Sequence, residues 1–98
     1  MMNAKVAMLI LYLHIPGADS LKAKRSRLKP LLARLRREFN IAAAEIGYHD
    51  RWGEALLGCV ALSTEAGHAQ RALQQVAAWV ERHWQDVEVH GDEIEMLL

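Results

Sequence analysis

The basic residues of this chain gather in one segment. The stretch SLKAKRSRLKPLLARLRR, residues 20–37, holds eight of the twelve Lys and Arg residues and no Asp or Glu. Such a cluster can bind phosphate groups, because Lys and Arg neutralise a polyanion and release its counterions. It is equally typical of a solvated helix face, where the stems cover apolar neighbours and the charged heads stay in water. A capped helix start can also hold a small anion on its free N–H groups.

Placed on a helix at about 100° per residue, these charges divide around a stripe of leucines. Arg27 and Arg34 fall on one flank of the stripe, and most of the other basic residues fall on the opposite flank. Lys24 lies on the stripe itself, so its side chain must either pass the helix end or pair with an acid. The candidate RNA or anion contacts are therefore Ser20, Lys22, Lys24, Arg25, Lys29 and Arg36.

The other residues that carry chemistry form no catalytic pattern. The five histidines have no metal-ligand spacing, so His14 is expected to be a strand-end or interface residue and no metal site is expected. Cys59 is typical of a small buried hydrophobe. Glu45 is typical of an edge-strand charge, although Glu45, Asp50 and Glu54 together offer acid/base chemistry. With no nucleophile–base pair and no Gly-rich cofactor loop, we expect neither enzymatic activity nor a cofactor.

Composition places the chain among small globular domains, with residues 1–98 as a single domain. The net charge is zero, but the basic segment is offset by acids concentrated in residues 81–98, and this asymmetry matters more for partners than the sum. The single cysteine excludes an internal disulfide and favours a reducing compartment. The first apolar run is too short for a membrane span and lacks a cleavage site. A soluble cytoplasmic protein with no membrane partner is expected.

The hydrophobic periodicity predicts four strands and two helices in the order β-α-β-β-α-β. A ferredoxin-like α+β fold follows, with a four-stranded antiparallel sheet and both helices on one face. The strands are predicted at 4–15, 41–48, 54–63 and 86–98, and the helices at 20–38 and 65–84.

Several residues predict local features of these elements. Pro30 predicts a kink at residues 26–30 or a first turn separate from the main helix, because proline removes a helical hydrogen bond. Ser20 is expected to cap the first helix, and Ser63 or Thr64 the second. Gly91 predicts a bulge or bend in the last strand.

The first strand is apolar on both faces. If the helices cover its leucine face, the opposite row is left exposed, and such a row is typical of an interaction surface. A loop or the C-terminal tail can cover that row, but we favour a homodimer packed through the sheet face. Trp52 either anchors this interface or packs on its own domain. The candidate interface residues are Val6, Met8, Ile10, Tyr12, His14 and Trp52.

Three segments carry a family resemblance: LHIPGADSLKAKR (13–25), FNIAAAEIGYHDRW (39–52) and VEVHGDEIEML (87–97). Together they resemble the YlxP-like family of uncharacterised small bacterial proteins. The resemblance implies a ferredoxin-like α+β fold, a dimeric assembly and no established activity. Relatives are sometimes encoded beside translation and ribosome-maturation factors, which implies contact with RNA or the ribosome. The chain departs from the family pattern at Ala23, where relatives tend to have Glu, and at Pro30.

Overall fold

The computed structural model describes residues 2–98 and has the predicted element order. The strands form one antiparallel sheet in the order β2-β3-β1-β4. This arrangement confirms the ferredoxin-like α+β fold. The elements are β1 (Lys5–His14), α1 (Leu21–Glu38), β2 (Ala42–Gly47), β3 (Glu54–Ser63), α2 (Ala66–His83) and β4 (Glu88–Met96).

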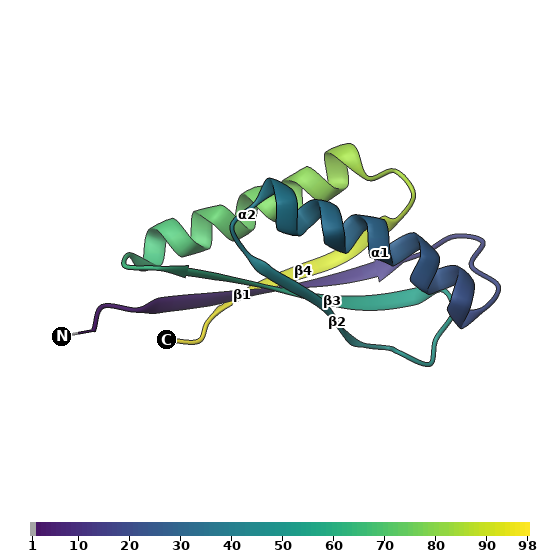
Figure 1. Cartoon of the computed structure of the whole chain (residues 1–98), viewed down its shortest axis with the longest axis horizontal. Coiled ribbons are helices and arrows are strands. Elements are labelled where there is room, and N and C mark those ends of the chain that lie inside the picture. Colours follow the sequence, from purple (N-terminus) through teal and green to yellow (C-terminus); the bar gives the residue numbers. More distant parts are fainter. Residues whose placement is uncertain (1) are drawn as a thin grey trace.

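Both helices lie on one face of the sheet, and the described chain places no element on the other face (Figure 1). The core lies between these two layers. It is built from alternate residues of β1, such as Leu9 and Leu11, which are fully buried with Leu57 of β3 and Leu31 of α1. Because side chains alternate across a strand, the intervening residues of β1 must point to the open side.

The first helix is continuous from Leu21 to Glu38 and passes through Pro30 without a separate first turn. Ser20 caps it as predicted, because its Oγ accepts a hydrogen bond from the Ala23 N–H at 2.9 Å. The prediction for the second helix is wrong, because its N-cap is Glu65, which makes no side-chain capping bond. Ser63 still contributes there, since its Oγ accepts from the Glu65 N–H at 3.2 Å.

The predicted irregularity in β4 is a bulge next to Gly91. Tyr12 pairs with Gly91, whereas Leu13 pairs with Val89, so His90 is the extra residue of the bulged strand. After β4 the C-terminal tail stays in the plane of the sheet, because the Leu98 carbonyl accepts from the Val6 N–H at 3.1 Å. The tail therefore extends the sheet edge and does not fold over the open face.

Candidate functional site

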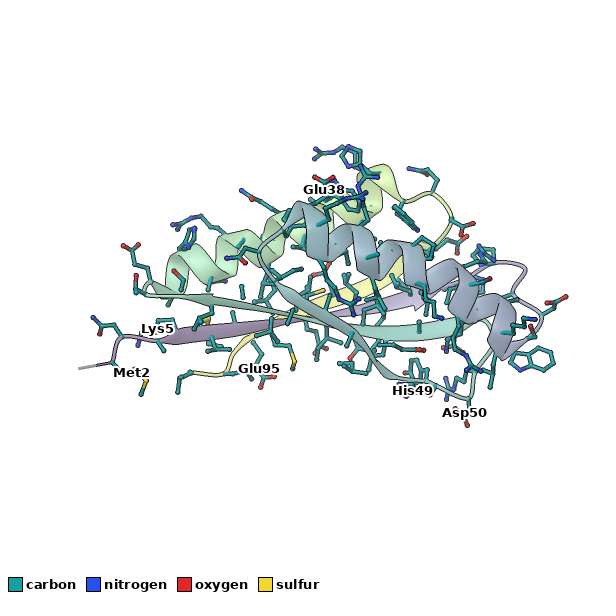
Figure 2. All side chains as sticks on the ribbon, viewed as in Figure 1. Met2, Lys5, Glu38, His49, Asp50 and Glu95 are labelled. Atoms are coloured by element: carbon teal, nitrogen blue, oxygen red, sulfur yellow. The ribbon has the colours of Figure 1, made fainter. Side chains whose placement is uncertain are left out.

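The open face of the sheet is apolar over three strands and acidic along the fourth. Met8 pairs with Val60 on one side and with Glu95 on the other, and Ile10 likewise lies beside Glu93. Glu95 projects on the side of the sheet away from the helices, opposite Glu38 (Figure 2). Eight large side chains form this surface, which we call the open face: Val6, Met8, Ile10, Tyr12, Ile46, Leu56, Val60 and Leu62.

The predicted interface residues fall into two groups. Val6, Met8, Ile10, Tyr12 and His14 are all partly exposed and share the open face, as the alternation predicted. Trp52 lies apart from them in the β2–β3 loop, residues 48–53, and is 55% exposed. The loop occupies the end of the domain opposite Met2 and Lys5, as its labelled residues His49 and Asp50 show (Figure 2).

Lys24 is a buried structural residue and not a surface cation. Its side chain is 1% exposed, and its Nζ lies 2.9 Å from Glu45 Oε2. The same ammonium group donates to the carbonyls of Tyr48 at 2.6 Å and Arg51 at 2.8 Å. Two carbonyl hydrogen bonds and one carboxylate contact thus surround the ammonium group, so Lys24 joins α1 to the β2–β3 loop and is not free for a phosphate.

The β2–β3 loop, to which Lys24 is hydrogen-bonded, contains a residue with a positive φ angle. Tyr48 has φ of 60°, the one described residue other than glycine with a positive φ. A non-glycine residue in this region costs about 1–3 kcal/mol and persists only where its surroundings impose it. Here the hydrogen bond from Lys24 to the Tyr48 carbonyl helps to hold the backbone in this conformation.

Three of the five remaining predicted anion contacts form a small basic ridge. Lys22, Arg25 and Lys29 line one hollow on α1, and no ion pair among residues 2–98 involves them. Arg36 is held elsewhere, because its Nη2 donates to the Ala43 carbonyl at 2.6 Å. Ser20 is occupied by its capping bond. The structure therefore brings three of the six predicted residues together on one surface, the basic ridge.

A second hollow, of about 460 Å³, lies where the open face meets the β2–β3 loop. We call it the sheet-end hollow. The rings of His14 and His90 stack in its wall, with centroids 5.4 Å apart. His90 also contacts Glu88 Oε1 through Nε2 at 3.1 Å. The residues that line the sheet-end hollow include Tyr12, His14, Tyr48, Glu54, His90 and Gly91.

Sequence reasoning placed His14 at the interface but missed its neighbours in this hollow. His90 reaches His14 only because of the β4 bulge, and Tyr48 and Glu54 reach it through the loop and the β1–β3 register. His14 pairs directly with Glu54, so the two side chains share one face. The alternating pattern and Gly91 were the available signals, but neither fixes register between strands distant in sequence.

Cys59 behaves as its sequence context indicated, whereas Glu45 does so only in its place on an edge strand. Cys59 is fully buried, and burial raises the pKa of its thiol to about 11. Glu45 lies on the edge strand β2, but it faces α1 and pairs with Lys24. Within residues 2–98, no three His, Cys, Asp or Glu side chains are placed together to hold a metal ion. Neither described helix is long and apolar enough to cross a membrane.

Comparison with known proteins now places the chain. A family model described as "Protein of unknown function (DUF503)" matches residues 6–93. The chain belongs to this family. The uncharacterized protein YlxP of Bacillus subtilis (strain 168) is 39% identical over 67 residues, which are 68% of this chain and 73% of YlxP. The resemblance seen in the three sequence segments is thereby confirmed, and the DUF503 match spans every residue of the sheet-end hollow.

A solved structure supports the fold of this DUF503 member independently. The de novo designed protein Foldit4 has a TM-score of 0.53 to the chain, covering 96% of this chain and 97% of the designed one. The two sequences are 14% identical, so the likeness concerns the backbone arrangement alone. It carries no information about what the DUF503 family does.

Proposed function

We propose that the chain is a non-enzymatic binding module that assembles as a homodimer through its open face. The observation that carries this is the row of large apolar side chains on the side of the sheet that neither helix covers. Leu62 is 68% exposed and Ile46 is 44% exposed. A contiguous apolar patch of this kind on a small domain is typical of a protein interface.

The size of the open face supports one two-fold contact. The apolar strands β2, β3 and β1 are six to ten residues long, and at about 3.3 Å per residue and about 4.8 Å between strands they give about 400 Å² in flat projection. Side-chain relief adds to this area. A standard interface buries about 800 Å² per partner, so two copies packed face to face form a contact at the small end of the range, without help from the helices.

The charges on the face favour one arrangement of the two copies. A two-fold axis parallel to the strands lays β3 over the partner's β3 and leaves each β4 at the rim. Glu93 and Glu95 then stay in water, which gives the interface an apolar centre and a polar border. An axis across the strands would lay β4 on β4 and bring like charges together. We therefore propose the first arrangement, with His14 toward one end of the contact.

The dimer is tested by size-exclusion chromatography with light scattering at micromolar concentration. Wild type is expected to elute at twice 11.1 kDa. Val60→Lys places a charge at the centre of the open face and is expected to give a monomer. Gln74→Lys adds the same side chain to an exposed position on α2 and should leave the dimer intact. A monomeric wild type, or a Val60→Lys variant that stays dimeric, would refute the proposal.

A second candidate function is supported by the basic ridge. Lys22, Arg25 and Lys29 carry three positive charges that no acid among residues 2–98 pairs with, on the opposite layer from the open face. Trp52 follows Arg51, whose carbonyl is bound to Lys24 of the same helix turn, so an exposed aromatic ring lies near the ridge. Basic groups beside an aromatic ring suit RNA, through phosphate contacts and base stacking. We propose RNA or the ribosome as the partner of this surface, and the cytoplasm as its location.

This candidate is tested by the salt dependence of binding to a structured RNA. Each lost phosphate contact lowers the slope of log K against log salt by about 0.7–0.9. The triple variant Lys22→Glu, Arg25→Glu, Lys29→Glu is therefore expected to abolish binding at low salt, whereas Arg71→Glu on α2 should not. Lys24 is left unchanged because it is structural. Absence of binding by wild type at low salt would remove the candidate.

A further inference from the structure

The sheet-end hollow gathers polar groups that the fold does not use. No hydrogen bond among residues 2–98 engages the ring nitrogens of His14 or the hydroxyls of Tyr12 and Tyr48, and all three residues line the hollow. His90 uses Nε2 toward Glu88 and leaves Nδ1 unbonded. A concave site with several aromatic walls and a few convergent polar groups is the usual form of a small-molecule site.

The charge around the hollow is acidic. Glu54 lines it, and Glu88 lies beside it on His90. Arg51 is the cation that contacts this group, and its Nη1 reaches both Glu54 oxygens only at 3.3 Å, with both side chains about half exposed. Each carboxylate can accept more than one donor. A ligand that enters here therefore meets negative charge that is only partly neutralised, which disfavours an anion.

One side chain at the rim of the hollow, Arg51, already places a guanidinium group against Tyr48 and Glu54. The guanidinium carbon of Arg51 lies 4.3 Å from the centroid of the Tyr48 ring, while the same group contacts Glu54. A planar cation is thus already held between an aromatic face and a carboxylate, which is the cation–π geometry that favours guanidinium. Lys24 binds the backbone carbonyl of the same tyrosine.

We propose that the sheet-end hollow binds the guanidinium group of a small ligand or of an arginine side chain. Glu54 is the counter-ion, the stacked pair of His14 and His90 and the ring of Tyr12 form the walls, and Arg51 is an internal competitor at the rim. Every one of these residues comes from a single chain, so the site is complete without a dimer. Because Tyr12 and His14 also border the open face, the titration is repeated on the Val60→Lys variant, in which no dimer covers the hollow, so failure of the site and failure of the dimer remain distinguishable.

The test is a calorimetric titration with agmatine, with N-carbamoylputrescine as the matched ligand that lacks the guanidinium charge. Wild type is expected to bind agmatine and not the urea analogue. Glu54→Gln should weaken agmatine at least about tenfold, because a charge-assisted pair is lost. Arg51→Gln should tighten it, because the competitor is removed while the Arg51 backbone carbonyl still accepts from Lys24. Glu38→Gln, at a carboxylate paired with Arg34 elsewhere on the surface, is the control and should change nothing.

A steric variant separates the hollow from the general charge of the surface. A Cβ at Gly91 would meet the Tyr12 ring at 3.6 Å, an ordinary contact, so Gly91→Ala should fold normally and narrow the hollow. It is expected to weaken agmatine several-fold without changing charge. Repeating the titration with N-acetylarginine methylamide distinguishes the sources, since equal binding indicates an arginine side chain and selective binding of agmatine indicates a free small molecule. Binding of neither guanidinium, or an affinity unchanged in Glu54→Gln and Gly91→Ala, would overturn the proposal.

Discussion

Replacing Lys24 with Met is expected to destabilise the domain more than any other single change among the basic residues of α1. The substitution keeps most of the side-chain volume and removes only the ammonium group, so the effect reports on its three contacts. These are the ion pair with Glu45 and the hydrogen bonds to the carbonyls of Tyr48 and Arg51.

The magnitude follows from what is left behind. Breaking a buried ion pair by removing one partner costs about 3–5 kcal/mol, because the other charge stays uncompensated. Glu45 Oε2 is buried, but the side chain as a whole is 16% exposed on an edge strand, so water reaches the other carboxylate oxygen and the lower end applies. We expect a loss of about 3 kcal/mol in the free energy of unfolding, which for a domain of this size lowers Tm by roughly 10–20 °C.

The assay is urea unfolding followed by circular dichroism and tryptophan fluorescence. Arg25→Met is the matched control, because it makes the same kind of substitution on the neighbouring residue, whose side chain is exposed; it should change stability by less than about 0.5 kcal/mol. The double variant Lys24→Met, Glu45→Gln should recover part of the loss, since it no longer leaves a buried charge. A Lys24→Met variant as stable as Arg25→Met would refute the reasoning.

Three further outcomes are expected. Cys59 should react with a thiol reagent at pH 8 only when the protein unfolds. Burial raises the pKa of its thiol to about 11, so between about pH 9 and 11 the unfolded chain loses this proton while the folded chain keeps it. The free energy of unfolding should therefore fall over that pH range. The hydrogen bond from Arg34 lowers the pKa of Glu38, so an NMR titration should show that pKa rising toward its ordinary value in Arg34→Ala. Leu11→Ala, at a fully buried core position, should cost about 2–5 kcal/mol in thermal or urea unfolding, because it leaves a cavity.

Periodicity in the sequence predicted the fold because each element has one clear apolar face. The alternation in residues 4–15 and the leucine spacing in residues 20–38 both match the buried positions. The second helix cap could not be predicted, because Ser63, Thr64 and Glu65 are consecutive and tertiary packing decides where the helix begins. Pro30 predicted a kink or a separate first turn, and the separate turn is wrong because one helix runs from Leu21 to Glu38.

The site was less predictable because it depends on register. His14 and His90 are far apart in sequence and meet only through a bulge that shifts the pairing by one residue. Lys24 and Glu45 are each a charged residue within an otherwise apolar pattern. That the two pair with each other could have been inferred from this shared feature. Once the fold has removed water from a cation and an anion, pairing them offsets part of the cost of burying each charge.

Ion pairs within the domain also reduce the number of cations that the basic segment, residues 20–37, offers to a polyanion. Counted along the chain, it presents eight cations, but the fold uses several of them internally. Lys24 is buried, Arg27 pairs with Asp86, and Arg34 pairs with Glu38. Five of the eight cations then have no acid partner among residues 2–98, and three of these five form the ridge of Lys22, Arg25 and Lys29. A binding defect in a Lys24 variant would therefore report unfolding and not recognition, so RNA binding has to be judged on the ridge alone.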